Sequence, residues 1–368
     1  MIKICHITTK HRAFDTRIFY KECNALKSVY SVVLLASNAR NEVVNDIKIV
    51  GFKYVEGLMV GNYWNIFYAA YRQKATLYHI HDPELLPVAR FLKLLGKEII
   101  YDIHENYAET LKEHHYPWLV RNVFCFFENW ATRNCALILA ERSYIRIYQE
   151  RAANFCVVEN FCDVKALQSY VVADRTNCRK MIYIGTLHSH RGALVMIEVL
   201  HLLRERGLDI SLDLVGKITE AGLMKKLNRL PFYNSLKEHI TWYGPLSLSE
   251  SYMVAQQSFA GLCMLEGFPN HTESYPTKIF EYMAVGLPVV ASNFSLYRSV
   301  VERRECGICL PFDDVNALAD ALEQIYTDKN LRLKYAANGP VNVAQNYNWN
   351  SERNILLDFY HKILRKKN

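Results

Sequence analysis

Short apolar runs alternate with longer amphipathic stretches along the first half of the chain. The runs are rich in β-branched residues, and the spacing of apolar residues at Arg17–Lys27 and Pro83–Leu95 predicts helices between them. This alternation is typical of a doubly wound α/β domain, in which crossover helices join parallel strands. The expected strands are Lys3–Thr8, Ser31–Ala36, Leu77–His81, Lys97–Asp102, Leu137–Ala140 and Cys156–Val158.

A polar stretch from Asp163 to Lys180 separates this pattern from a second one. A new strand is expected at Met181–Gly185, and beyond it helices and strands alternate again, which predicts a second Rossmann-like unit. The tail from Ser351 to Lys367 predicts a last helix with one apolar side. The further elements expected in the second unit are the helices Ala193–Arg206, Glu220–Leu230, Ser249–Gln257 and Thr277–Val285 and the strands Ile210–Val215, Ile240–Tyr243, Ala260–Met264 and Pro288–Ala291.

A chain of 368 residues exceeds what one hydrophobic core usually serves, which also favours two domains. We expect an N-terminal Rossmann-like domain at residues 1–172, a second one at 173–350, and a helix at 351–368 that packs back on the first domain. If the two domains face each other, the carboxyl ends of their strands form the two walls of one cleft. That arrangement suits a donor on one wall and an acceptor on the other.

Composition and charge narrow the possible partners. The hydrophobic fraction of 51% and the charged fraction of 22% are those of a globular protein. The net charge of +7 is spread along the chain and favours anionic partners such as nucleotide diphosphates or lipid head groups. Nucleic acid fits poorly, because no basic stripe is interleaved with stacking aromatic residues.

Targeting signals and metal-ligand spacings are missing from the sequence. The apolar start at Met1–Ile7 is too short for a signal peptide, and no run reaches the roughly 18 apolar residues of a membrane span, so we expect a cytoplasmic protein. Ten cysteines follow no metal-ligand spacing and are expected to be buried thiols. The C-x-x-C pair of Cys306 and Cys309 has no second pair or histidine partner, which favours packing there.

The segment Glu273–Glu281 combines the residue types that most suggest chemistry. Its loop, Ser274–Thr277, leads into an expected helix with Lys278 in the first turn. Backbone N–H groups and the dipole at a helix N-terminus favour a phosphate, and the lysine adds a positive charge. Glu281 could accept hydrogen bonds from a ribose diol, while Glu273 could hold sugar hydroxyls or stabilise positive charge at an anomeric carbon.

The same residues have an ordinary structural interpretation. Glu273 would then be a solvated loop residue, Lys278 a first-turn surface lysine and Glu281 an exposed helix position. The context favours function, because the helix ends in a Gly286–Pro288 turn that leads straight into a buried strand.

Several ordered motifs of this sequence resemble the retaining glycosyltransferases of family 4, which have the GT-B fold of two Rossmann-like domains. Glu273–Glu281 is similar to their E-x7-E motif, and Glu281–Ala291 reads E-Y-M-A-V-G-L-P-V-V-A, as in that family. The resemblance covers nearly the whole chain and is weaker in the first half. The other stretches that look like those of bacterial members are Arg12–Arg17, His79–Pro87, Tyr101–Glu105, Val158–Phe161, Tyr183–Gly185 and Arg191–Gly192.

The resemblance implies a nucleotide-sugar donor site in the second domain. Glu281 would bind the nucleotide ribose, and Arg191 and Lys278 would be cations on the pyrophosphate. Family members often carry an arginine two residues after the glycine of the opening strand, but Leu187 stands there in this sequence, so Lys217 is a candidate supplement. The loop that would bind pyrophosphate and donor sugar together with Lys278 consists of Ser274, Tyr275, Pro276 and Thr277.

Three residues at expected strand ends complete the donor side. Gly185 would let the backbone approach the phosphates closely, although a strand-to-loop turn would need a glycine as well. Gly216, beside Lys217, and Tyr243 occupy strand exits where the family places the base, and a plain turn is an equal alternative at both.

His104 and four neighbours are the candidates on the acceptor side. His104 follows an expected strand, and in the similar family a histidine at such a position contacts the donor sugar or phosphate. His81 and His79 share one face of the preceding strand and could either join the site or support His104. Asp15 and Arg17 would shape the acceptor site, or else Asp15 caps a helix and Arg17 is a surface side chain.

The stretch His114–Trp130 combines large aromatic side chains with few charges. It predicts a buried helix, or alternatively a helix that presses Trp118, Phe124 and Phe127 toward lipid, which would suit a lipid-linked acceptor.

The resemblance implies transfer with retention of anomeric configuration. Lys278, Arg191 and the loop amides would stabilise the departing nucleotide diphosphate, whose phosphate is a plausible proton acceptor. No D-x-D motif lies at a credible donor-loop position, so neither a catalytic metal nor another cofactor is required. Among nucleotides UDP is the base-rate choice, and the setting that the family analogy implies is surface polysaccharide assembly, as in capsule or lipopolysaccharide.

Two other classes of function stay open. An epimerase or hydrolase acting on nucleotide sugars could use the same fold, and so could an inactive protein that only binds nucleotides. A nicotinamide oxidoreductase is disfavoured, because no G-x-G-x-x-G follows the first strand.

Overall fold

The computed structural model describes residues 1–55, 59–113 and 115–365. Two residues of the expected segments lie outside these described residues: His114, the first residue of His114–Trp130, and Lys367, the last residue of Ser351–Lys367. The chain divides into two compact units, of which each is described by itself.

Unit 1 contains residues Met1–Asn160 and the C-terminal segment from Trp349, and unit 2 contains Phe161–Asn348. The sequence pattern places the first boundary later, after residue 172. The difference has a packing cause: Phe161 meets the Phe280 ring edge-on at 4.8 Å between ring centroids, within a core of unit 2.

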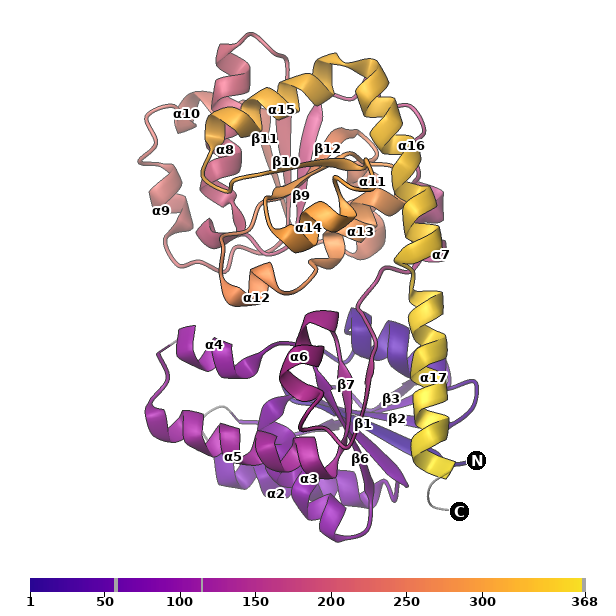
Figure 1. Ribbon diagram of the computed structural model, residues 1–368. Helices are drawn as coiled ribbons and strands as arrows, with labels where there is room; N and C mark the ends of the chain where they lie inside the picture. Colours follow the sequence, from indigo (N-terminus) through magenta and orange to yellow (C-terminus); the bar gives the residue numbers. More distant parts are fainter. Residues whose placement is uncertain (56–58, 114, 366–368) are drawn as a thin grey trace. The chain divides into compact units, whose positions relative to one another are not determined.

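Parallel strands form the sheets of both units. Among the described residues of unit 1, eight strands follow the order β3-β4-β2-β1-β5-β6-β7-β8, and all neighbours are parallel except the β3–β4 hairpin. Unit 2 has a six-stranded parallel sheet in the order β11-β10-β9-β12-β13-β14. The expected doubly wound α/β class, with two Rossmann-like sheets, is therefore confirmed (Figure 1).

The strands agree closely with the expected apolar runs. In unit 1 they are β1 (Lys3–Thr8), β2 (Ser31–Ser37), β3 (Glu42–Val44), β4 (Ile47–Phe52), β5 (Leu77–Ile80), β6 (Glu98–Ile103), β7 (Ala136–Leu139) and β8 (Asn154–Val157). In unit 2 they are β9 (Lys180–Ile184), β10 (Ser211–Val215), β11 (Ile240–Gly244), β12 (Ser258–Cys263), β13 (Val289–Ser292) and β14 (Gly307–Leu310).

Helices cover both faces of the unit 1 sheet. One face carries α2, α3 and α5, whose inner side chains form a core with the sheet, and the other carries η1, α1 and the C-terminal helix α17. The helical segments are η1 (Thr16–Cys23), α1 (Asn24–Leu26), α2 (Met59–Arg72), η2 (Pro83–Leu85), α3 (Leu86–Leu94), α4 (Tyr107–Glu113), α5 (Trp118–Asn134), η3 (Arg142–Tyr144), α6 (Ile145–Tyr148) and α17 (Trp349–Arg365).

Unit 2 repeats this three-layer arrangement, with one apolar core on each face of its sheet. Its helical segments are α7 (Val164–Leu167), η4 (Gln168–Tyr170), η5 (Ser189–Arg191), α8 (Ala193–Glu205), α9 (Leu223–Leu227), α10 (Tyr233–Leu236), η6 (Lys237–His239), α11 (Leu248–Ala255), α12 (Pro269–Thr272), α13 (Thr277–Ala284), α14 (Ser295–Val300), α15 (Val315–Thr327) and α16 (Lys329–Asn346).

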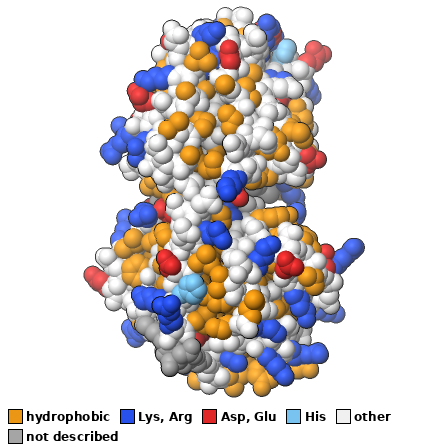
Figure 2. All heavy atoms as spheres, turned by 90° about the vertical axis from the view of Figure 1, so that its right-hand side faces the viewer, with side chains coloured by type: hydrophobic (Ala, Val, Ile, Leu, Met, Phe, Trp, Pro, Cys, Tyr) orange, Lys and Arg blue, Asp and Glu red, His pale blue; other side chains and the backbone are white. Residues whose placement is uncertain are grey.

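The molecular surface carries mixed charge. Figure 2 shows lysine and arginine side chains spread over both units, with aspartate and glutamate side chains among them on that face. Within the described ranges, no helix combines the length and the apolar content needed to cross a bilayer.

Candidate active site

The donor residues predicted in unit 2 gather where β9 and β10 end and α13 begins. Gly185 follows β9 and Gly216 follows β10, and both have positive φ angles, of +141° and +145°. A Cβ on Gly216 would lie 1.8 Å from the carbonyl oxygen of Gly185, and a Cβ on Gly185 would lie 2.8 Å from Lys278 Nζ. Gly216 is therefore needed because a side chain there would collide with the backbone, whereas at Gly185 the φ angle disfavours other residues and a Cβ would displace the flexible end of Lys278.

Lys278 is not the surface lysine of the ordinary interpretation. Its side chain is only 8% exposed, and Nζ lies 3.7 Å from the centroid of the Tyr183 ring. Among the described residues, Nζ has no hydrogen-bond acceptor. A buried ammonium without an acceptor is costly, so this site calls for an anion.

The N-terminus of α13 adds to the positive potential. Pro276 precedes the helix, and within the described part of the chain no side-chain cap bonds to its first turn. The first backbone N–H groups of a helix carry its positive dipole end and bind phosphates readily. Lys278 and this helix end thus offer two features that attract a diphosphate.

Glu281 is held by a residue that the sequence did not single out. The Tyr252 hydroxyl, on α11, donates a 2.7 Å hydrogen bond to Glu281 Oε2. Burial, followed by the neighbouring Glu281 charge, raises the pKa of Tyr252 well above its ordinary value, so the hydroxyl stays a donor. A tyrosine partner could not be foreseen, because its role depends on two helices that are distant in sequence.

Arg191 ends η5 and is followed by Gly192 in the left-handed conformation. The loop is anchored to the strand end of β12, since Glu266 N donates to His190 O at 2.9 Å and the His190 ring pairs with the Glu266 carboxylate. Burial raises the pKa of Cys263, at the end of β12, to about 11, while the charges of Lys278 and Arg191 act in the opposite direction. Both cations therefore act on the same strand end.

The other residues predicted for the donor site differ from one another in burial and in contacts. Glu273 follows α12 and is partly buried, Ser274 Oγ donates to the Asn270 carbonyl, and the Tyr275 ring packs 5.2 Å from that of Phe280. The Lys217 side chain is exposed at the exit of β10. The Tyr243 hydroxyl interacts with Asp213 and Lys180 of the sheet, which turns it away from the strand exit.

In unit 1, His104 stands at the carboxyl end of β6 with a carboxylate behind it. Its Nε2 lies 2.7 Å from Asp102 Oδ2, and its side chain is 18% exposed. Burial raises the pKa of the Asp102 carboxyl, but the positive charge of Arg17 lowers it more. The net pKa of Asp102 therefore lies well below its ordinary value. Since an ionised carboxylate only accepts, Nε2 of His104 donates and Nδ1 is the ring atom left to meet a ligand.

Arg17 lies in the interior and does not line a site directly. It is 4% exposed, and its guanidinium contacts Asp102 at 2.9 and 3.0 Å, the Val158 carbonyl at 3.0 Å and Glu22 Oε1 at 3.0 Å. Its burial contradicts the surface side chain of the second sequence interpretation, while the acceptor-shaping role stays a prediction, which Arg17 could fulfil through Asp102. The guanidinium fixes Asp102, which in turn orients His104.

Asp15 fits the capping interpretation. Its Oδ1 accepts from the backbone N–H groups of Arg17 at 2.8 Å and Ile18 at 3.0 Å, at the start of η1. Its Oδ2 lies 3.5 Å from Nδ1 of His11. The carboxylate therefore shapes the loop and reaches the site edge only through His11.

His81 and His79 are buried support residues. His81 Nε2 lies 2.9 Å from His6 Nδ1, and its Nδ1 lies 3.4 Å from His104 Nε2. Burial lowers the pKa of His81 to about 4, so the ring is neutral at physiological pH. His79 Nδ1 lies 2.6 Å from the hydroxyl of Tyr360 on α17, which ties the C-terminal helix to this network.

Beside His104 lies His11, a half-buried histidine that the sequence did not indicate. The His11 ring lies 5.0 Å from the His104 ring, and its Nε2 lies 3.5 Å from Asp82 Oδ1. Burial lowers the pKa of His11, but the hydrogen bond to Asp15 and the Asp82 charge outweigh it, so the net pKa is raised. Asp82 Oδ2 also accepts from Thr9 N at 2.7 Å, which fixes the loop after β1.

Among the described residues, two groups of side chains have the composition of a metal site. His6, Glu22, His79 and His81 present ligand atoms within 4.8 Å of one another, as do His81, Asp102 and His104. In both groups the carboxylate is already paired with the guanidinium of Arg17. A hydrogen-bonded network held by a buried cation accounts for this arrangement.

Comparison with known proteins gives this arrangement its context. Residues 171–341, most of unit 2, match the family model described as Glycosyl transferases group 1. A phosphatidyl-myo-inositol mannosyltransferase of Mycobacterium leprae is 28% identical over 291 residues, which cover 77% of this chain and 73% of that protein. A GDP-mannose-dependent alpha-(1-6)-phosphatidylinositol monomannoside mannosyltransferase of Mycobacterium tuberculosis is 22% identical, over 49% of this chain and 46% of that protein.

Solved structures share the fold over nearly the full length. Sucrose-phosphate synthase from Thermosynechococcus elongatus aligns with a TM-score of 0.78 at 17% identity, covering 100% of both chains. Anabaena Alr3699/HepE in complex with UDP aligns with a TM-score of 0.75 at 14% identity, covering 98% of this chain and 100% of the other. The fold is that of the GT-B glycosyltransferases.

The protein is thus a glycosyltransferase. More specifically, its residues 171–341 match the model of the glycosyl transferases group 1, in agreement with the resemblance seen in the sequence motifs.

Proposed function

We propose that this protein transfers a hexosyl group, with retention of configuration and without a metal ion, from a nucleotide diphosphate to a saccharide or lipid-linked saccharide. The setting that we propose is surface polysaccharide assembly, such as capsule or lipopolysaccharide, at the inner face of a membrane. The observation that carries the proposal is the buried ammonium of Lys278, which has no acceptor among the described residues and lies beside the N-terminus of α13.

The diphosphate of a donor satisfies this ammonium better than any neutral ligand. Charge-assisted hydrogen bonds to phosphate are about twice as strong as neutral ones, and burial removes competing water. Gly185 keeps the space next to Nζ open, since a Cβ there would come within 2.8 Å. We therefore assign the pyrophosphate to Lys278, Arg191 and the amides of the Ser274–Thr277 loop.

Glu281 is the proposed partner of the nucleotide ribose. Tyr252 occupies one oxygen of the carboxylate and fixes its orientation. Carboxylate oxygens accept more than one hydrogen bond each, so the group can still receive both hydroxyls of a ribose diol. The role of Glu273 is proposed as sugar recognition or stabilisation of positive charge at the anomeric carbon.

The reaction then proceeds by electrostatic stabilisation of the leaving group. The bond between the anomeric carbon and the phosphate oxygen breaks, and its electron pair stays on the nucleotide diphosphate. Lys278 and Arg191 stabilise that developing charge. The acceptor hydroxyl forms the new glycosidic bond on the same face of the sugar and passes its proton to the departing phosphate.

We place the acceptor at the rim formed by His104 and His11 in unit 1. Asp102 fixes the His104 tautomer, so that Nδ1 is offered to a sugar hydroxyl or phosphate. The raised pKa of His11 favours the imidazolium, a hydrogen-bond donor, and its carboxylate partners Asp15 and Asp82 already balance that charge, so the ring sets no preference for an anionic acceptor.

The base of the donor is the least constrained part of the proposal. UDP is the first candidate, and the Anabaena protein in complex with UDP has the same fold. GDP-mannose is the alternative that the name of the mycobacterial relative suggests. The two candidates differ in base and sugar but use the same diphosphate site.

Product analysis tests the proposed reaction. The protein is incubated with UDP-glucose or GDP-mannose, a crude lipid-linked acceptor extract and EDTA, and the products are followed by NMR. Transfer with the anomeric configuration of the donor supports the proposal. Free sugar or an epimerised donor without a new glycosidic bond would instead identify a hydrolase or epimerase, and loss of activity with EDTA would refute metal independence.

A further inference from the structure

Unit 1 carries an apolar face that its own core does not use. On α2, Trp64 and Tyr68 are each more than 60% exposed, although large aromatic side chains usually contribute to a core or an interface. They lie four residues apart and therefore on the same side of the helix. Ile66 and Ala70, on the opposite side of α2, are buried against the sheet.

The neighbouring helices α3 and α5 also expose large apolar side chains. On α3, Phe91 and Leu94 are 56% and 77% exposed, and on α5 Leu119 and Phe126, seven residues apart, are 59% and 58% exposed. Trp118, at the beginning of α5, is also exposed. We call these seven outward side chains the aromatic face: Trp64, Tyr68, Phe91, Leu94, Trp118, Leu119 and Phe126.

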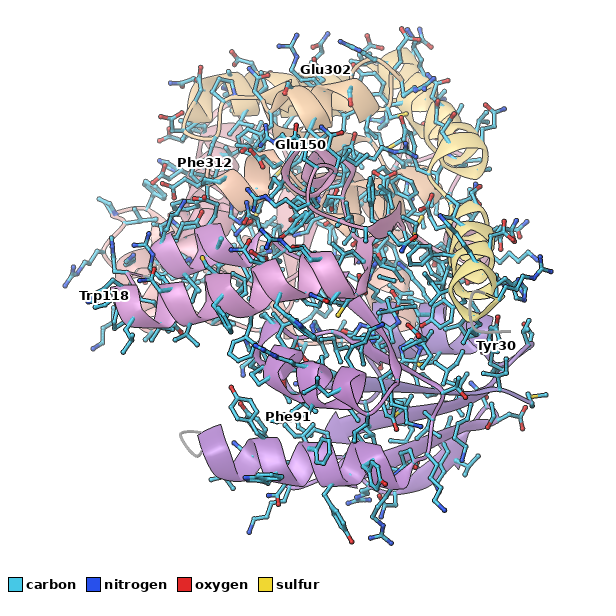
Figure 3. The ribbon with its side chains drawn as sticks, turned by 60° about the horizontal axis from the view of Figure 1, so that its bottom comes forward. Tyr30, Phe91, Trp118, Glu150, Glu302 and Phe312 are labelled. Atoms are coloured by element: carbon cyan, nitrogen blue, oxygen red, sulfur yellow. The ribbon has the colours of Figure 1, made fainter. Side chains whose placement is uncertain are left out.

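The aromatic face is continuous from one helix to the next. The Phe67 ring lies 6.2 Å from the rings of both Trp64 and Phe91, which connects α2 to α3. The Arg90 guanidinium lies 5.5 Å from the centroid of the Phe126 ring, which connects α3 to α5. Figure 3 shows the three helices side by side, with Phe91 between α2 and α3 and Trp118 at the first turn of α5.

The structure corrects part of the prediction that Trp118, Phe124 and Phe127 face lipid. Trp118 is exposed as that alternative requires, but Phe124 is buried in the core and Phe127 is partly buried against it. The outward positions are those of Leu119 and Phe126 instead. α5 is therefore a half-buried helix with an apolar outer side.

The charges of these helices are almost all of one sign. α2, α3 and α5 carry the five cations Arg72, Arg90, Lys93, Arg121 and Arg133, against one acid, Glu128. Glu128 is buried, and its Oε1 accepts a 2.8 Å bond from the Tyr148 hydroxyl. A surface of exposed aromatic side chains with cations among them matches an anionic bilayer interface.

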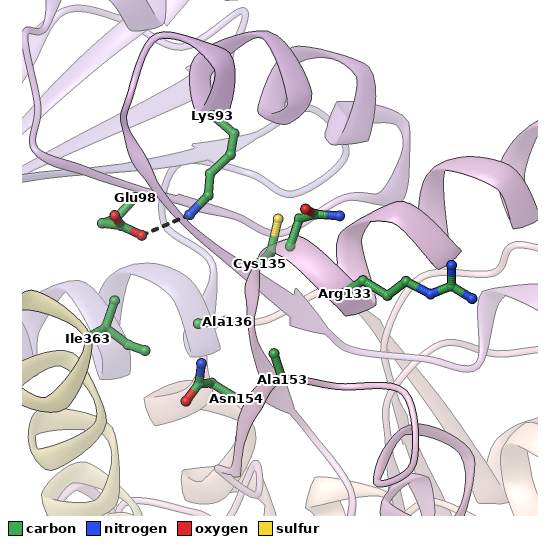
Figure 4. A pocket seen from close by; sticks show the side chains of 9 residues that line it. Lys93, Glu98, Arg133, Cys135, Ala136, Ala153, Asn154 and Ile363 are labelled. Carbon is green, nitrogen blue, oxygen red and sulfur yellow. Dashed lines mark hydrogen bonds and ion pairs between the residues drawn. The ribbon is translucent and has the colours of Figure 1, made fainter. Parts of the chain in front are cut away.

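Two hollows lie where the basic side chains meet the aromatic face. One, of about 300 Å³, is lined by Arg90, Phe126, Trp130 and Arg133. The other, of about 190 Å³, includes Arg133 and Lys93, and its Lys93 Nζ contacts Glu98 Oε2 at 2.9 Å (Figure 4). Arg133 borders both, so a lipid phosphate would find a cation at the edge of the apolar surface.

We propose that the aromatic face of unit 1 binds the surface of a bilayer that contains anionic lipid. This proposal rests on the proposed function, which places the protein at a membrane. It adds which surface of unit 1 contacts the bilayer and which lipid charge that surface prefers. A second copy of the chain fits less well. In a symmetric dimer the same patch meets itself, so its arginines would face one another, while Lys93 is balanced by Glu98.

Vesicle co-sedimentation of the full-length protein tests the proposal. Vesicles of phosphatidylcholine with 30% phosphatidylglycerol at roughly 0.1 M salt should bind the protein, and phosphatidylcholine alone should bind it at least about tenfold more weakly. The variant Trp64→Ser/Tyr68→Ser/Phe91→Ser should lose at least about tenfold of the binding. The variant Arg72→Gln/Arg90→Gln/Arg133→Gln should lose the dependence on anionic lipid.

A matched control carries three serine substitutions at exposed apolar positions of unit 2, Leu248, Met253 and Val341. It should bind vesicles as the wild type does. Equal binding by the wild type and the Trp64/Tyr68/Phe91 variant would overturn the proposal, and so would a concentration-dependent dimer that this variant abolishes. The substituted side chains are exposed except Arg90, which is half-buried, and unchanged melting temperatures confirm that the variants fold. Nucleotide binding is measured separately, so failure here leaves the donor site intact.

Discussion

A Cβ built on Gly185 would lie 2.8 Å from Nζ of Lys278, so a side chain at this position would displace the buried ammonium. The φ angle of Gly185, +141°, would also strain any other residue. The position therefore combines two requirements, of backbone conformation and of space next to a cation.

Replacement of Gly185 by alanine should weaken nucleotide binding by about tenfold or more, because Lys278 must move away from the diphosphate. Gly207→Ala is the matched control: Gly207 also has a positive φ, of +79°, but a Cβ there meets nothing within 4 Å. Each change should lower stability by about 1 kcal/mol through backbone strain. Calorimetric titration with nucleotide checks the difference, and equal weakening in both variants would contradict it.

Tyr252→Phe should release Glu281 and raise the KM for the donor by about three- to tenfold, with a smaller effect on kcat. Its hydroxyl is the donor to Glu281 Oε2 at 2.7 Å. Tyr148→Phe removes a similar buried bond, to Glu128 in unit 1, and should change stability without changing the donor KM. Steady-state kinetics with varied donor checks this prediction, which an unchanged KM in Tyr252→Phe would refute.

Asp102→Asn should lower turnover by about a hundredfold or more, because the amide cannot hold the same His104 tautomer. His104→Ala should have an effect of similar size. Since the two residues act as one unit, the double variant should lose little more than either single one. Additive losses in kcat, or a pH–rate profile that Asp102→Asn leaves unchanged, would show that Asp102 does not act through His104.

Stability should fall as pH rises through neutrality, because of Glu352 on α17. Burial raises the pKa of its carboxyl to about 7, although Glu159 N donates to its Oε2 at 2.7 Å. The folded state therefore keeps this proton up to about pH 7, whereas the unfolded chain releases it near the ordinary pKa of about 4.5. The contribution of Glu352 to the free energy of unfolding is therefore complete below that value and is lost between about pH 5 and 7. Melting curves from pH 5 to 8 should show this loss, and Glu352→Gln should flatten it; an equally steep profile in the variant would exclude Glu352 as its source.

The sequence reveals elements whose evidence is local. The apolar runs at β1 and β9 are visible because every residue of a buried parallel strand tends to be apolar. The β3–β4 hairpin escaped notice, although its turn residues Asn45 and Asp46 both have positive φ angles, of 50° and 61°. Its first strand is too short to show an alternating pattern.

Residues whose role depends on distant partners could not be found this way. Arg175 lies in the polar stretch before β9 and reads as a solvated residue, yet it is 1% exposed and donates to the carbonyls of Ala255, Ser258, Val285 and Gly286. Arg17 and Asp102 are 85 residues apart, and their pairing follows only from the sheet order that brings β6 near η1. The motif at Lys278 and Glu281 was recognisable because its residues lie within one helix.

Nucleotide titration of the wild type and of Lys278→Met tests the central claim most directly, with Lys329→Met, an exposed lysine of the same unit, as the control. UDP or GDP should bind to the wild type and to Lys329→Met with equal affinity. Lys278→Met should bind at least about thirtyfold more weakly, which corresponds to about 2 kcal/mol. Binding of neither nucleotide to the wild type, or undiminished binding to Lys278→Met, would contradict the assignment of the donor site.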